Sequence, residues 1–174
     1  MLAGAREGAK REIIGEEVRS SALTTDRPAL YYALGLLYEL EEPEEPLDEA
    51  GEMEFAKTRL GAMREAFEQG LSVMHPGERS ALAVVMRWRA AAAALGLHDG
   101  AAAVAHYHEV VDLLNDPTLE DSPRPNLEFI KLPAKHQIYA PLADAYTLQG
   151  QTAEAIEALQ AAKTHLPYNR EIYT

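Results

Sequence analysis

Three histidines and the acids near them are the residues of this chain whose types best suit a metal ion. They are His98, His106 and His108, with Asp99, Glu109 and Asp112. Residues two apart on a helix point in nearly opposite directions, so His106 and His108 cannot easily share one ion. His108 and Asp112 do share a helix face, but the sequence has no His-Glu-x-x-His pattern. We therefore expect surface or groove histidines, with no metal and no cofactor.

Nucleophilic chemistry has no better support. The chain contains no cysteine, which excludes disulfides, thiolate zinc sites and a cysteine nucleophile. Its serines lack a local nucleophile motif. Gly96, Gly100 and Gly150 lie at expected helix–helix turns, whereas a phosphate-binding loop joins a strand to a helix. The sequence therefore predicts a protein without enzymatic activity.

Carboxylates are concentrated in residues 39–54, a segment with no basic residue. They are Glu39, Glu41, Glu42, Glu44, Glu45, Asp48, Glu49, Glu52 and Glu54. Catalytic carboxylates need burial and rigid support, and a segment interrupted by Pro43 and Pro46 provides neither. Two interpretations stay open, a solvated insertion or a docking patch for a basic partner. The net charge of −12 argues against binding to nucleic acid or to anionic membranes.

Apolar residues recur at three- and four-residue steps along most of the chain, which predicts an all-α protein. The alternating pattern of strands is missing, and alanine and leucine dominate. The length of 174 residues suits one domain, 1–174, with an N-terminal helix within 1–24, the acidic insertion 39–54 and a Pro-rich loop 115–135. We expect helices at about 5–23, 28–40, 48–74, 78–97, 99–114, 136–149 and 152–165.

The expected helix at 48–74 is unusually long. At 1.5 Å per residue it would measure roughly 40 Å and extend past the shorter helix before it. Its apolar residues Met53, Ala56 and Leu60 would then need cover, from the N-terminal helix or from a second subunit.

The last third of the chain raises three more local expectations. Thr152 has the side chain of a helix N-cap. Pro141 suits the opening turn of a helix that starts near Tyr139. Residues 127–132 are apolar enough to dock, either on the groove or edge of the chain itself or on a neighbouring chain.

The most regular pattern of the sequence lies between residues 139 and 167. It reads Tyr139-x2-Leu142-Ala143-x2-Tyr146, followed by Gly150, Ala155, Leu159, Ala162 and Pro167. This pattern resembles the tetratricopeptide repeat, with Ala143 in place of glycine and Leu159 in place of an aromatic residue. The small residues would let two helices approach closely, and Gly150 would end the first helix in a left-handed conformation.

Two further copies of the pattern precede this one. The first copy reads Tyr31-x2-Leu34-Gly35-x2-Tyr38, with an insertion before its second helix. The middle copy is degenerate and reads Trp88-x2-Ala91-Ala92-x2-Leu95, and its alignment needs a turn that is one residue short. The three repeats cover about 28–76, 78–117 and 136–169.

The resemblance implies a right-handed superhelical stack of about three helical hairpins, with a short capping turn at 168–174. It also implies a non-catalytic protein–protein interaction module, an adaptor or assembly factor, that binds a peptide or helix in its concave groove. The groove residues that it suggests are Tyr32, Glu39, Arg87, Arg89, Gln137, Asp144 and Thr147. For Tyr32 and Thr147, burial against the next helix is the alternative. An aspartate at 144 would repel a carboxylate, which argues against a co-chaperone that clamps a C-terminal carboxylate.

Two other roles remain open at this level. Length, acidity and repeat number are similar to those of small secretion-type or client-specific chaperones, an analogy of fold alone. A self-assembling homodimeric scaffold is the second alternative. The sequence shows no signal peptide and no membrane-spanning apolar segment, and with the lack of cysteine this favours a cytoplasmic location.

Overall fold

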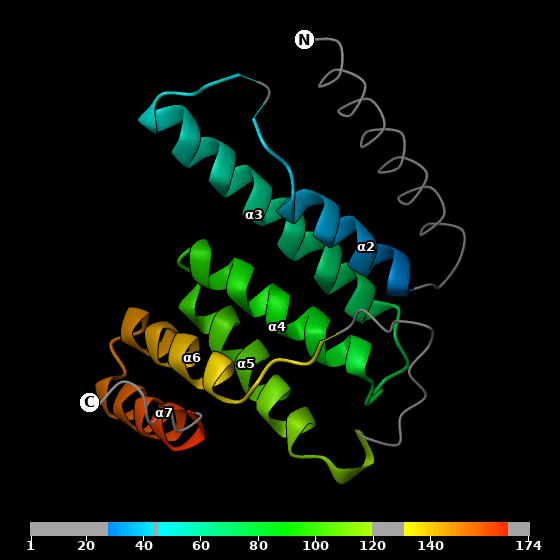
Figure 1. The fold of residues 1–174 in the computed structure, drawn as a ribbon, viewed down its shortest axis with the longest axis vertical. Helices are drawn as coiled ribbons and strands as arrows, with labels where there is room; N and C mark the ends of the chain where they lie inside the picture. The colour runs from blue at the N-terminus through cyan, green and yellow to red at the C-terminus, as the bar shows by residue number, and fades with distance from the viewer. Residues whose placement is uncertain (1–27, 44, 120–130, 167–174) are drawn as a thin grey trace, which may run out of the picture.

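The computed structural model describes residues 28–43, 45–119 and 131–166. These residues form helices and no strand, which confirms the all-α expectation. The expected helix at 5–23, Pro167 and the segment 168–174 lie outside the described residues. In the labels of Figure 1, the helices are α2 (Pro28–Glu39), α3 (Glu49–Ser72), α4 (Ala81–Gly96), α5 (Gly100–Leu114), the short 3-10 helix η1 (Pro117–Leu119), α6 (His136–Leu148) and α7 (Thr152–His165).

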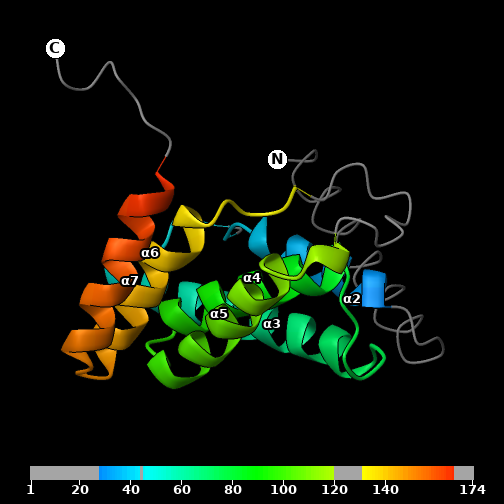
Figure 2. The same cartoon turned by 90° about the horizontal axis from the view of Figure 1, so that it is seen from below.

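Each α-helix packs against the next one in the chain, so that three hairpins lie side by side in chain order (Figure 1). The hairpins are α2–α3, α4–α5 and α6–α7. In addition, α4 contacts α6. Seen from below, α7 forms one end of the stack (Figure 2).

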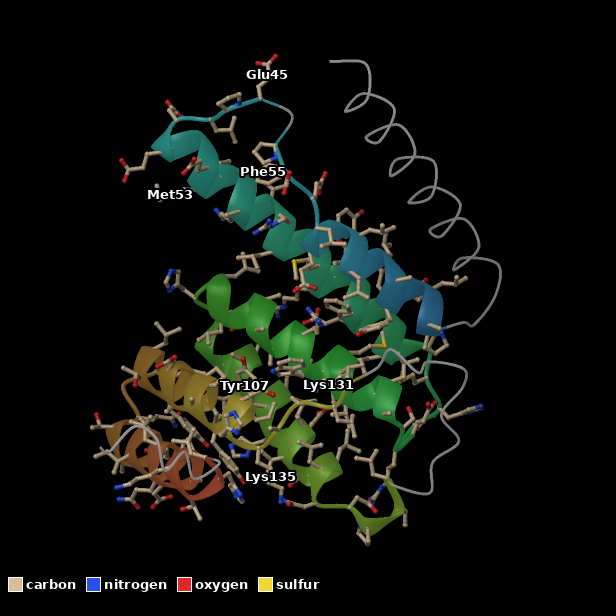
Figure 3. The ribbon with its side chains drawn as sticks, viewed as in Figure 1. Glu45, Met53, Phe55, Tyr107, Lys131 and Lys135 are labelled. Carbon is tan, nitrogen blue, oxygen red and sulfur yellow. The ribbon has the colours of Figure 1, made fainter. Side chains whose placement is uncertain are left out.

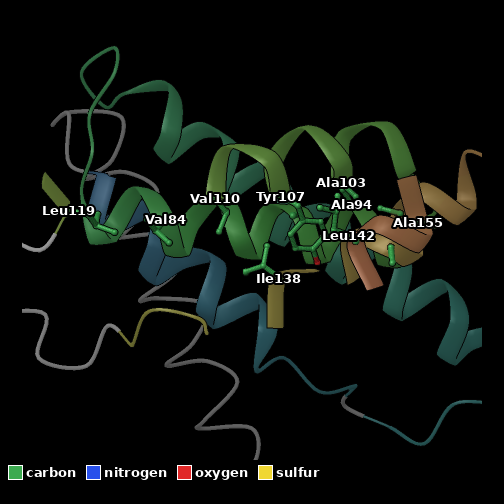
Figure 4. Close-up of a cluster of buried hydrophobic side chains, with 13 residues drawn as sticks. Val84, Ala94, Ala103, Tyr107, Val110, Leu119, Ile138, Leu142 and Ala155 are labelled. Carbon is green, nitrogen blue, oxygen red and sulfur yellow. The ribbon is translucent and has the colours of Figure 1, made fainter. Parts of the chain in front are cut away.

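The middle helix α4 is buried on nearly all sides because it lies between two apolar clusters. Val84, Ala91 and Ala94 belong to the cluster shared with α5, α6 and α7 (Figure 4). Met86 and Ala90 belong to the cluster shared with α2 and α3. Alanines at its centre let neighbouring helices approach from opposite sides, because side-chain size sets the interaxial distance.

Side-chain caps explain where three helices begin. Asp48, Ser80 and Asp99 accept hydrogen bonds from backbone N–H groups at the starts of α3, α4 and α5, which satisfies donors that the helix itself leaves free. The expectation for Thr152 was wrong. Gln151 holds the N-cap position of α7 without a side-chain hydrogen bond, and Thr152 is the first helical residue.

Helix α6 begins at His136, as the expected range 136–149 predicted, so Pro141 lies inside it and the suggested start near Tyr139 was wrong. Proline has no N–H group, and the helical hydrogen bond to the carbonyl of Gln137 therefore cannot form. The turn before Pro141 is held in another way, because the backbone N–H of Ala134 donates to Oε1 of Gln137 at 2.8 Å.

Only the middle of the acidic insertion forms a loop, as the expected helices at 28–40 and 48–74 implied. Glu39 ends α2 and Glu49 begins α3, so both ends of the segment 39–54 are helical. The rest of the insertion lengthens α3 to 24 residues, twice the 12 of α2. The first turns of α3 project beyond α2 and α4 (Figures 1 and 3). Met53 lies there and is 68% exposed.

The turns of the second and third hairpins match each other in detail. The N–H of Asp99 donates to the carbonyl of Ala94 at 2.9 Å, and that of Gln151 donates to Tyr146 at 3.0 Å. The residue before each donor is left-handed, His98 with φ 60° and Gly150 with φ 71°. Positions 52 residues apart therefore correspond, as Asp99 does with Gln151.

This correspondence corrects the alignment of the middle repeat. Ala94 takes the place of Tyr146, and Arg87 takes the place of Tyr139. Trp88 is therefore one residue away from the aromatic position that the sequence assigned to it. The turn has its full length, with His98 where a repeat would carry glycine, and this substitution concealed the register.

Candidate functional site

A cleft of about 490 Å³ opens between α2, α4 and α6. We call it the central cleft. Its wall includes the segment 131–134, which runs across α4 before α6 begins (Figures 1 and 3). The cleft thus joins parts of the chain that are far apart in sequence. Its lining residues are Tyr32, Val85, Trp88, Arg89, residues 131–134, His136 and Gln137.

One part of the wall is aromatic and apolar. Trp88 is half-buried and is the only tryptophan of the chain. The ring of Tyr32 is tilted against the buried ring of Phe67, with centroids 6.0 Å apart. Leu132 packs against both apolar clusters, which holds the loop segment on the helices. This wall offers rigid aromatic surface next to an open volume, as peptide-binding sites do.

The polar groups of the wall are cationic or neutral. Arg89 forms an ion pair with Glu39 of α2, and its guanidinium carbon lies 5.5 Å from the ring centroid of Trp88. Lys131 is exposed at the rim (Figure 3). No carboxylate is among the described lining residues, although the whole chain carries a net charge of −12. The cleft therefore differs in charge from most of the molecule.

The start of α6 is fixed from outside the cleft. Nζ of Lys135 donates to Oδ1 of Asn115 at 2.6 Å, and the N–H of Ala134 donates to Gln137. The first bond connects the start of α6 to the end of α5, and the second holds the turn that leads into α6.

Three of the seven suggested groove residues line the central cleft. They are Tyr32, Arg89 and Gln137, and they come from three different helices. Glu39 lies beside the cleft as the ion-pair partner of Arg89.

The other three suggested residues point elsewhere. Arg87 pairs with Glu109 of α5 and so faces the partner helix of its own hairpin. Oγ1 of Thr147 donates to the carbonyl of Ala143 at 2.9 Å, within α6. Asp144 is exposed and does not line the cleft. The lining of the central cleft therefore does not include the aspartate that was expected to repel a carboxylate ligand.

Asp144 instead acts on Tyr107 of the preceding hairpin. Burial raises the pKa of Tyr107 to about 12, and the negative charge of Asp144 contributes to the shift. Tyr107 is 1% exposed and belongs to the core between α5 and α6.

Sequence reasoning missed Trp88 as a lining residue because the misaligned middle repeat made it a structural aromatic. His136 and residues 131–134 were missed because they belong to a segment without periodicity. One signal was available, since residues 127–132 were expected to dock. Leu132 does lie on the chain's own core and cleft, and residues 127–130 lie outside the described part.

The three histidines considered as metal ligands have separate neighbours. Nε2 of His108 lies 2.5 Å from Oη of Tyr146, and Nε2 of His106 lies 3.4 Å from Oε1 of Glu68. His98 occupies the α4–α5 turn. Within the residues that the structure describes, no three histidine or acidic side chains gather as a metal would require.

Two findings about the whole chain complete this description. None of the described helices combines the length and the apolar character needed to cross a membrane. Compared with family models, with curated proteins and with solved structures, the chain matches none of them.

Proposed function

We propose that this protein is a non-catalytic interaction module that binds a peptide segment of another protein in the central cleft. The observation that carries the proposal is the convergence of α2, α4 and α6 on one open volume lined by aromatic, cationic and neutral polar side chains. In the proposal, the three hairpins form a superhelical stack like that of tetratricopeptide repeats. The matching α4–α5 and α6–α7 turns support it.

The chemistry of the cleft suggests which part of a peptide would bind. Trp88 and Leu132 offer surface for one apolar side chain. Lys131 and Gln137 offer hydrogen-bond donors at the rim, where they are exposed. An extended peptide with an apolar anchor and nearby carbonyl or carboxylate acceptors fits this arrangement, because anchors supply affinity and polar groups fix orientation.

Peptide selection tests the proposal directly. A displayed library of random peptides would be selected on the purified chain, and the selected peptides would be titrated against the fluorescence of Trp88. Lys131→Glu should weaken their binding about tenfold, equivalent to roughly 1.4 kcal/mol. Lys57→Glu is the matched control, since Lys57 is equally exposed but lies on the projecting end of α3.

Two outcomes would refute the proposal. One is a selection that yields no peptide with saturable binding. The other is a set of peptides whose affinity changes equally with Lys131→Glu and Lys57→Glu, because binding would then follow total charge rather than the cleft.

A further inference from the structure

The outer side of α7 carries a row of apolar side chains that no described helix covers. Ile156, Leu159 and Leu166 are 50%, 53% and 54% exposed. Ile156, Leu159 and the exposed Lys163 lie at three- and four-residue steps on one side of the helix, and Leu166 follows them as the C-cap residue. We call these four residues the α7 stripe.

The corresponding side of α5 shows what such a row does inside the stack. The residues 52 positions earlier are Val104, Tyr107, Val111 and Leu114, and all four belong to the apolar cluster that contains Ile138 and Leu142 of α6. Tyr107 is 1% exposed, whereas its counterpart Leu159 is 53% exposed.

Polar contacts confirm that α6 lies on this side of α5. Nε2 of Gln149, directly after α6, donates to the carbonyl of Gly100 at 3.1 Å. Nε2 of His108 lies 2.5 Å from Oη of Tyr146. A Cβ added to Gly100 would lie 2.9 Å from the carbonyl oxygen of Ala145. The side of α5 that matches the α7 stripe is therefore a helix-binding side, and α3 likewise packs against the helix that follows it.

We propose that the α7 stripe binds a helix of another protein whose contact face is like that of α6, with aliphatic and small residues and one carboxylate. This surface is separate from the central cleft, and the inference does not depend on the proposed function.

The positive charge of Lys163 indicates that the partner helix carries a carboxylate. Lys163 stands where α5 has Val111, so the stripe contains one cation among apolar residues. On α6, Asp144 lies near enough to Tyr107 to affect its ionisation. A helix seated on α7 as α6 is on α5 would therefore bring a carboxylate next to Leu159, one turn from Lys163.

The same charge argues against a second copy of α7 as the occupant. A symmetric pair would place each stripe against its own copy. The stripe contains a lysine and no acid, so such a pair would bury two cations without an opposite charge, which is costly. A helix with an acid at the matching position has no such cost.

The experiment uses a synthetic, fluorescently labelled peptide of residues 134–149, which contains α6, as the helix probe for the full chain. Fluorescence anisotropy should show saturable binding that Leu159→Asp weakens at least tenfold. Thr164→Asp is the matched control on another side of α7 and should change the affinity less than twofold. Lys163→Glu should weaken binding severalfold, and a peptide with Asp144→Lys should restore it.

Three results would overturn the inference. The first is no saturable binding of the peptide in the millimolar range. The second is equal binding to wild type and Leu159→Asp, which would mean that the peptide binds elsewhere, for example by displacing α6 from α5. The third is a concentration-dependent dimer of the chain in sedimentation equilibrium that Leu159→Asp abolishes, which would make a second copy the occupant. Circular dichroism of each variant checks that it is folded.

Discussion

At the scale of single residues, side-chain size at a few contacts decides how closely the helices pack. Gly35 of α2 faces the buried ring of Phe67, and a Cβ added there would lie 2.3 Å from Cε1 of that ring. Gly70 meets Met86 and Tyr31 in the same manner. The sequence pattern anticipated the small residue at 35. Only the packed hairpins show what a side chain at either position would touch.

Gly35→Ala should lower the free energy of unfolding by about 1–3 kcal/mol, because the buried Phe67 ring cannot move aside without strain. Gly61→Ala is the control within α3, where nothing lies within 4 Å of the added Cβ. It should raise the free energy of unfolding by about 0.5–1 kcal/mol, since alanine favours the helix. Urea midpoints at constant m-value measure both. Equal effects of the two substitutions would show that α2 and α3 are not in close contact at Gly35.

Tyr107 should make stability depend on alkaline pH. Its pKa is raised from 10.0 to about 12, first by burial and then by the charge of Asp144. The contribution of the neutral phenol is fully present below pH 10 and is lost as pH rises toward 12, because the unfolded state ionises first. The free energy of unfolding should therefore fall by roughly 2–3 kcal/mol more in wild type than in Tyr107→Phe over this range. Parallel pH profiles from urea unfolding of the two proteins would contradict the assignment.

At the scale of elements, the periodicity of apolar residues predicted the α-helices between residues 28 and 165. The predicted ends lie within a few residues of the observed ones. The predictions from the sequence were wrong where a residue type is unusual for the local structure that it occupies. Pro141 suggested a helix start, but side-chain bonds of Gln137 support an earlier one. His98 concealed a turn because a left-handed backbone is uncommon for any residue other than glycine. The alignment of α4 with the repeat pattern depends on that turn. The alignment in turn decides which of Arg87 and Arg89 is expected to line the cleft.

Replacing the left-handed residue should change the stability of the protein in opposite directions at the two matching turns. His98→Gly should stabilise the protein by about 1 kcal/mol, because glycine adopts φ 60° without steric cost. Gly150→Ala should destabilise it by a similar amount of roughly 1 kcal/mol, since φ is 71° there. Thermal unfolding of both variants is the measurement. A destabilised His98→Gly would indicate that the imidazole makes a stabilising contact that outweighs the backbone strain.

At the scale of the whole molecule, the cleft arises from contacts that no local pattern contains. Lys131 lines the same cleft as Tyr32 and Trp88 only because the segment before α6 returns across α4. The resemblance suggested that α2, α4 and α6 would share a face, and three of its seven groove residues line the cleft. Docking of residues 127–132 was expected, but the place where residues 131–134 lie was not, since an aperiodic Pro-rich segment has no preferred side. The same reasoning explains the exposed α7 stripe, whose apolar spacing is visible in sequence while its lack of cover is not.

We expect peptides to bind in the cleft beside Trp88. The most direct test is a two-dimensional ¹H–¹⁵N NMR titration with peptides selected on the purified chain. The chain has one tryptophan, so its indole N–H gives one signal. The account predicts that this signal shifts to saturation, together with the side-chain amide of Gln137, while the amides of α7 stay in place. Saturable binding that leaves the Trp88 indole signal unchanged would contradict it.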